Sequence, residues 1–185
     1  MRVLGIAGSL RADSYNRKVL LEAGELLPGH VNFEVYDGLK AVPPYDEDDD
    51  GDRASEAVND LRDAVAAADA ILFATPEYNA SVPGQLKNAI DWLSRPAGAG
   101  AVFGKPVAVV GASTGAFGAV WAQAELRKVL ATAGARVVEG EVAIGHAYER
   151  FDELGRLADD NLREQLAEVV DALLVEARPP VAVAA

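Results

Sequence analysis

The stretch VLGIA (residues 3–7) followed by GSLRADSYNR (residues 8–17) decides the fold of this chain. An apolar run, a polar turn with glycine and a helix-like segment predict a strand, a loop and a helix in that order. The turn is rich in hydrogen-bond donors: Ser9, Arg11, Ser14 and Asn16. The unpaired amides and the positive dipole end of the next helix lie at the same place. We therefore expect the turn to bind a phosphate group.

The turn has two other interpretations. It lacks the Gly-Lys-Ser/Thr ending of a Walker-type loop, so it does not predict a nucleoside triphosphate site. A simple helix N-cap made by Ser14 or Asn16 is the second alternative, because such caps occur in many proteins. The residue types favour phosphate binding, and the N-cap stays open as the alternative.

Composition narrows the class of protein. The chain has 185 residues, 50% of them hydrophobic and 25% charged, which is typical of a globular domain. A net charge of −12 argues against a nucleic-acid partner, whose phosphates require a basic face. No apolar stretch approaches the roughly 18 residues that a membrane span needs. The absence of cysteine excludes disulfides, thiolate metal sites and a cysteine nucleophile.

The start of the chain runs directly into a strand and lacks the layout of a signal peptide, so we expect a cytoplasmic protein. Residues 1–177 are expected to form one domain. The tail, residues 178–185, begins with proline after Arg178 and is rich in small residues, so we expect it to be frayed.

Apolar runs alternate with amphipathic helical patterns along the chain. We expect strands near residues 3–7, 32–36, 70–74, 107–111 and 136–142. We expect helices near residues 16–27, 53–68, 84–94, 119–133 and 156–176. Runs such as AILFA (70–74) are apolar on both faces, as in parallel strands that are covered by helices on each side. The sequence therefore predicts a doubly wound, three-layer α/β fold with a five-stranded parallel sheet.

Three loops differ from the other connections: residues 8–17, 75–84 and 112–118. They follow the first, third and fourth predicted strands. In the flavodoxin-like order 2-1-3-4-5 these strands are neighbours, and their loops meet at one edge of the sheet. In the dinucleotide-binding order the second of these loops would lie apart from the others. The pattern favours the flavodoxin-like order.

The contents of the loops suggest the kind of ligand. The second loop contributes Pro76, Tyr78 and Asn79, and the third contributes Gly115 and Gly118. Glycines without side chains allow a flat ring to approach closely. A phosphate beside a planar ring describes flavin mononucleotide (FMN) better than a sugar phosphate. The alternative is that the proline and the glycines only shape their turns.

The acidic run DEDDD (residues 46–50) has two interpretations, a metal site or a solvated loop. It does not alternate ligands with spacer residues or carry glycine and glutamate at the set positions of a calcium loop, and like charges extend a chain. We therefore favour the solvated loop and expect no metal. The role of residues 46–52 is not determined by the sequence.

Three blocks resemble the NADPH-dependent FMN reductase family, a flavodoxin-like group that includes chromate and quinone reductases. They are GSLRADSYNR (8–17), the segment 68–95 with its PEYN motif, and GKPVAVVGASTGAFG (104–118). The resemblance also includes PPYD (43–46). It implies that the FMN phosphate is held by Ser9, Arg11, Ser14 and Asn16. It places the isoalloxazine ring against Pro76, Glu77, Tyr78 and Asn79, with Ser113 and Gly115 on the other side.

The resemblance also implies an activity. Such a protein takes hydride from NADPH or NADH through flavin N5 and passes it by a ping-pong mechanism to a small acceptor. The candidate acceptors of this protein are a quinone, free flavin, chromate, and an azo or nitro compound. The flavin carries the reaction, so no catalytic side chain is implied. Homodimers or homotetramers are common in the family.

Two functions from other classes remain as alternatives. A flavodoxin-like electron carrier would have the same fold and an acidic surface, but no activity of its own with NAD(P)H. A flavin-responsive regulatory protein would keep the loops without turnover. The sequence does not distinguish NADPH from NADH, identify the physiological acceptor or choose between dimer and tetramer.

Overall fold

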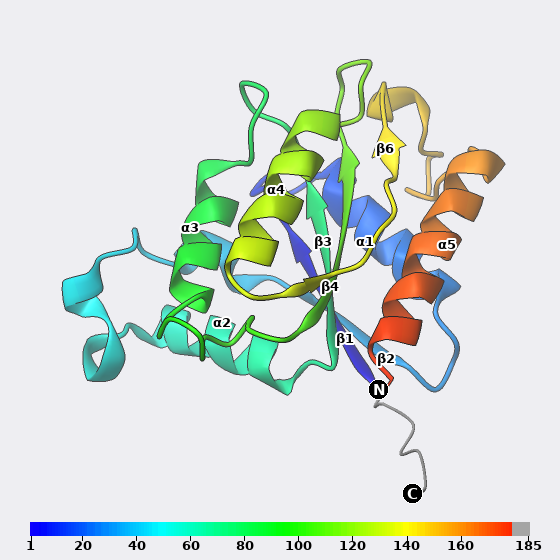
Figure 1. Cartoon of the computed structure of the whole chain (residues 1–185). Helices are drawn as coiled ribbons and strands as arrows, with labels where there is room; N and C mark the ends of the chain where they lie inside the picture. Colours follow the sequence, from blue (N-terminus) through cyan, green and yellow to red (C-terminus); the bar gives the residue numbers. More distant parts are fainter. Residues whose placement is uncertain (179–185) are drawn as a thin grey trace, which may run out of the picture.

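A parallel sheet in the order β2-β1-β3-β4-β5 forms the centre of the computed structural model, and β6 also pairs with β4 (Figure 1). The structure describes residues 1–178, so the predicted tail lies outside the described residues apart from Arg178. The strands are β1 (Arg2–Ala7), β2 (Asn32–Tyr36), β3 (Ala70–Thr75), β4 (Pro106–Ala112), β5 (Arg136–Val137) and β6 (Ala143–Ile144). The helices are α1 (Tyr15–Leu26), α2 (Glu56–Ala67), α3 (Gly84–Leu93), α4 (Val120–Thr132) and α5 (Asp160–Glu176). The predicted flavodoxin-like order is confirmed.

Alternate residues of the central strands pack against opposite layers of helices. Ile71 and Phe73 of β3 belong to a core cluster that includes residues of α2, α3 and α4. Leu72 and Ala74 belong to a second cluster that includes residues of α1 and α5. Burying one Ile or Phe side chain contributes about 1.5–3 kcal/mol. Because both faces are covered, every residue of β3 and β4 is buried, as the sequence predicted for these strands.

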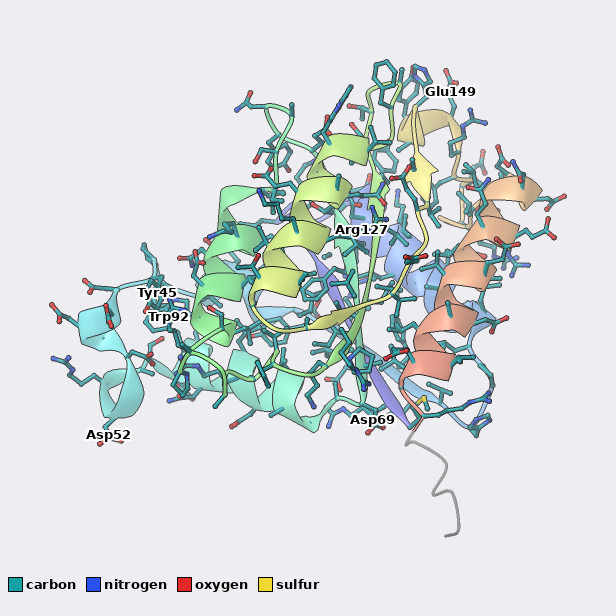
Figure 2. All side chains as sticks on the ribbon, in the orientation of Figure 1. Tyr45, Asp52, Asp69, Trp92, Arg127 and Glu149 are labelled. Carbon is teal, nitrogen blue, oxygen red and sulfur yellow. The ribbon has the colours of Figure 1, made fainter. Side chains whose placement is uncertain are left out.

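The last predicted strand, residues 136–142, differs from the structure. Its first two residues form β5, and β6 begins just beyond it at Ala143; between them Gly140 has a φ of +131°. The Arg127 guanidinium lies beside this segment (labelled in Figure 2) and donates hydrogen bonds to the carbonyls of Val109 and Gly140. An arginine side chain thus replaces part of the strand pairing that the apolar pattern predicted.

Two helices begin later than predicted because a capping side chain sets each start. Ser55 accepts a hydrogen bond from the Val58 amide at 3.4 Å, so α2 begins at Glu56. Asp159 accepts one from the Leu162 amide at 3.2 Å, so α5 begins at Asp160.

The acidic segment forms two short 3₁₀ turns, Glu47–Asp49 and Gly51–Arg53, away from the sheet. Tyr45, which directly precedes this segment, packs edge-on against Trp92 with 4.9 Å between the ring centroids. Asp52 lies at the outer end of the segment (Figure 2). Asp50 pairs with Arg62 at 2.9 Å. Within residues 1–178, no group of three or more His, Cys, Asp or Glu is arranged to hold a metal ion. No helix in this range is long and apolar enough to cross a membrane.

Candidate functional site

The three predicted loops follow the carboxyl ends of β1, β3 and β4, which are adjacent parallel strands, and the loops after β3 and β4 extend at the top of Figure 1. A cavity of about 90 Å³ lies between them. Its lining includes most of the predicted site residues: Ser9, Arg11, Ser14, Asn16, Pro76, Glu77, Tyr78 and Ser113. Asn79 and Gly115 do not line it, although both belong to its loops. Sequence reasoning missed Tyr15, Ala112 and Thr114, whose only signal was their position inside these loops.

The first loop presents hydroxyl groups that are oriented by backbone bonds. Ser14 is 3% exposed and caps α1, and its Oγ accepts a hydrogen bond from the Arg17 amide at 3.3 Å. Ser9 Oγ accepts one from the Arg11 amide at 3.5 Å. Each hydroxyl still has its own O–H to donate. The N-cap interpretation of Ser14 is therefore correct, and it leaves this side chain able to bind an anion as well.

Asn16 has a second task that was not expected. It is 2% exposed, and its Nδ2 donates to the Ala112 carbonyl while its Oδ1 accepts from the Ala112 amide, both at 2.9 Å. The side chain thus pairs with the end of β4 as another strand would. It ties the first loop to the end of β4, and both the amide nitrogen and the amide oxygen of Asn16 are engaged there.

The second loop is a tight hairpin. The backbones of Tyr78 and Ser81 exchange two hydrogen bonds of 3.2 Å. Asn79 and Ala80 between them have positive φ values of 54° and 58°, as in a type I′ turn. Left-handed geometry costs a non-glycine residue about 1–2 kcal/mol, so surrounding contacts must hold the hairpin in place. Tyr78, at the base of the hairpin, is 48% exposed.

Two carboxylates join this hairpin to α4. Glu77 Oε2 accepts hydrogen bonds from the amides of Trp121 and Ala122, each at 3.1 Å. It therefore caps a helix whose own N-cap residue makes no side-chain bond. In return, Glu125 of α4 accepts a 2.6 Å bond from the Ser81 hydroxyl, which is the main cause of the lowered pKa of Glu125. Oε2 of Glu77 is thus bonded to α4, while the residue also lines the cavity between the loops.

The third loop is held by the segment after β6. Gly115 donates to Ser113 Oγ at 3.1 Å, and its carbonyl accepts from the His146 amide at 3.0 Å. Gly118 has a φ of +59°, and a Cβ there would lie 2.3 Å from the Ala143 backbone. The expectation that Gly118 leaves room for a flat ring is therefore wrong, because the β6 backbone fills that space.

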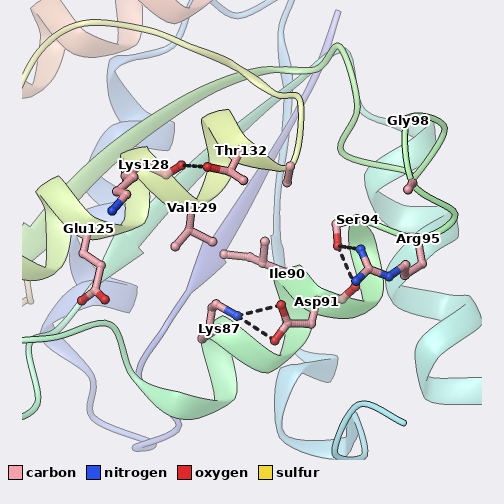
Figure 3. Close-up of a pocket in the computed structure, with 12 residues that line it drawn as sticks. Lys87, Ile90, Asp91, Ser94, Arg95, Gly98, Glu125, Lys128, Val129 and Thr132 are labelled. Atoms are coloured by element: carbon pink, nitrogen blue, oxygen red, sulfur yellow. Dashed lines mark hydrogen bonds and ion pairs between the residues drawn. The ribbon is translucent and has the colours of Figure 1, made fainter. Parts of the chain in front are cut away.

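A larger cavity of about 400 Å³ lies between α3 and α4 (Figure 3). It is lined by side chains such as Lys128 and Thr132 and by the Lys87–Asp91 ion pair, whose closest approach is 2.7 Å. None of the three loops contributes to it. It therefore lacks the oriented donors of the smaller cavity and is a poor candidate for the cofactor site.

A flavodoxin-like sheet with polar loops at its switch point defines a class of α/β proteins that bind nucleotides at the strand ends. The sequence profile of the family described as NADPH-dependent FMN reductase matches residues 1–149. The chain belongs to this family. Its predicted class, an oxidoreductase that uses FMN, is thereby confirmed.

Relatives with assigned names cover nearly the whole chain. An NAD(P)H-dependent FMN reductase of Pseudomonas aeruginosa is 45% identical over 174 residues, 94% of this chain and 93% of that protein. A 2-hydroxy-1,4-benzoquinone reductase of a Burkholderia species is 37% identical over 172 residues, 92% and 93% of the two chains. The solved structure of FerB, a flavoenzyme NAD(P)H:(acceptor) oxidoreductase of Paracoccus denitrificans, has a TM-score of 0.82 and 36% identity over 95% of this chain and 96% of that one.

Proposed function

We propose that this protein oxidises NAD(P)H through bound FMN and passes two electrons to small acceptors, with quinones foremost. The observation that carries the proposal is the convergence of the three loops on one cavity that begins at the N-terminus of α1. Relatives named quinone reductase support the choice of acceptor. Free flavin, chromate, and azo or nitro compounds are further acceptors of the proposed activity.

The proposed FMN phosphate site consists of Ser9, Arg11 and Ser14 with the first amides of α1. These groups fit a phosphate because two oriented hydroxyls, a guanidinium and a helix N-terminus face one small cavity. Local donors are needed here because the chain carries a net charge of −12, which by itself repels anions. We assign Asn16 the task of holding this loop against β4.

The cavity of about 90 Å³ is too small for a whole flavin, so the ring would extend onto the open edge of the site. Pro76, Tyr78 and Asn79 are proposed to border it on one side, with Ser113 and Gly115 on the other. Glu77 acts on this wall through its bonds to α4. When bound, FMN supplies the acceptance and release of hydride, and the protein supplies placement and electrostatics. We assign no catalytic acid or base.

The proposed kinetic scheme is ping-pong, because reductant and acceptor use the same open face in turn. We further propose a cytoplasmic homodimer or homotetramer. Phe117 and Trp121 support association of this kind, since they are 64% and 49% exposed and pack edge to face at the edge of the site. Large exposed aromatic pairs are typical of surfaces that are covered in an assembly.

Anaerobic titration tests the proposal. The FMN-loaded protein is expected to be bleached by one equivalent of NADPH or NADH and recoloured by 1,4-benzoquinone. Parallel lines in double-reciprocal plots are expected for NAD(P)H and quinone. Lines that intersect with every acceptor would contradict the shared face. The acidic surface is also consistent with a flavodoxin-like electron carrier. Such a carrier would oxidise almost no NAD(P)H without a partner protein.

A further inference from the structure

The cavity of about 90 Å³ that holds the proposed phosphate site is called the first cavity here. Another cavity, of about 210 Å³, lies beside it and is called the second cavity. It is formed by the first loop, the end of β2 and the 3₁₀ turn Gly38–Ala41. Ser9 and Arg11 line both cavities. The two cavities therefore share part of the first loop as a common wall.

This second cavity collects positive charge on an acidic protein. Arg11, Arg17 and Lys40 line it, and they come from three different segments. Within residues 1–178, Arg11 and Lys40 form no ion pair. Arg17 approaches Asp37 at 3.5 Å, but the Asp37 side chain is 76% exposed and is a weak partner. Asp37 also lines the cavity, but its three cations outnumber this one carboxylate, and such an excess of positive charge is suited to an anionic ligand.

FMN has a single phosphate group, and the proposed site for it is the first cavity. The cations of the second cavity are therefore available to another anion. NADPH carries such an anion on its adenosine ribose, where NADH has a hydroxyl. In other nucleotide-binding α/β folds, an acidic residue about 20 residues after the first loop binds this hydroxyl, and a nearby arginine accommodates the phosphate. Asp37 directly follows β2 and has Arg17 beside it, which is a comparable arrangement.

We propose that Arg17 and Lys40 bind the 2′-phosphate of NADPH and thereby set the preference for NADPH over NADH. This inference rests on the proposed NAD(P)H oxidoreductase activity. Asp37 opposes the phosphate by charge, and its pairing with Arg17 reduces that opposition. Arg11 is shared with the flavin site and is left out of the test for that reason.

The test compares the FMN-loaded protein with the variant Arg17→Gln/Lys40→Gln. Contacts of partly exposed charges are modest, so kcat/KM for NADPH with benzoquinone is expected to fall about tenfold. The value for NADH should change less than about twofold, because NADH lacks the charge that these residues recognise. Calorimetry with 2′,5′-ADP should show the same loss, and 5′-AMP should show none. Asp37→Asn should shift the preference further toward NADPH.

Two control variants accompany the test. Arg53→Gln removes an exposed cation that does not line the cavity, and it should leave the NADPH to NADH ratio unchanged. Arg17→Lys/Lys40→Arg keeps both charges and should retain most of the preference.

Three results would overturn the inference: equal losses with NADPH and NADH, weaker FMN binding, or no change with either nucleotide. Equal losses would place the pyrophosphate in this cavity. Failure of the unmodified protein to reduce quinone with either NADPH or NADH would instead refute the proposed function, so the two failures are distinguishable.

Discussion

Replacing Glu77 by alanine separates a structural task from direct contact with the cofactor. The change removes two 3.1 Å hydrogen bonds to the first turn of α4, whose own N-cap, Ala119, offers no side-chain bond. Losing an N-cap costs about 0.5–2 kcal/mol, and losing a carboxylate at a helix N-terminus costs about 0.3–1 kcal/mol. These effects overlap, so we expect the free energy of unfolding to fall by about 1–2 kcal/mol.

The measurement is unfolding of the FMN-free protein, by urea and by heat, followed by circular dichroism. For a chain of this size the expected loss lowers the Tm by roughly 2–8 °C. Glu77→Gln keeps an acceptor oxygen and should recover more than half of the stability. Glu153→Ala is the matched control, because it removes one exposed negative charge for which no hydrogen bond is found in the described part of the chain. It should leave the Tm unchanged.

FMN binding completes the test. If Glu77 acts through α4, weaker FMN binding accompanies the loss of stability, and the glutamine variant recovers both. A stable Glu77→Ala protein that binds FMN poorly would refute this reasoning and would return Glu77 to direct contact with the flavin.

Three further predictions concern the same loops. Ser9→Ala combined with Arg11→Ala should weaken FMN binding by about 3 kcal/mol or more, at about 1.5–3 kcal/mol for each bond to a charged group, as fluorescence titration would show. Unchanged affinity in a folded variant would remove the phosphate assignment. Glu125→Gln should destabilise the protein at neutral pH, and the difference from wild type should shrink as pH falls below 4.5, because the folded-state pKa of Glu125 is lowered from that value and its contribution is lost on protonation. A constant difference in urea stability down to pH 3 would contradict this. Gly118→Ala should destabilise more than Gly51→Ala in the same assay, since both have positive φ but only Gly118 would clash with β6; equal losses would show that backbone strain alone is responsible.

The sequence by itself determined the class of fold and predicted the location of the candidate site. Strands that are apolar on both faces require helices on both sides, so β3 and β4 predicted a parallel sheet before any contact was known. The loop after β1 could likewise be recognised locally, because its donors lie next to one another along the chain. Pattern and spacing are properties of short segments, and such properties can be read without knowledge of the tertiary structure.

The tertiary structure alone decided what several of these residues do. Asn16 bonds to a residue 96 positions away, and Glu77 bonds to one 44 positions away. Arg127 likewise divides the last strand through a contact with β4. A carboxylate or an amide carries no sign of its partner in the sequence. Its task depends on which backbone groups the packed layers bring within about 3 Å, and only the folded chain supplies them.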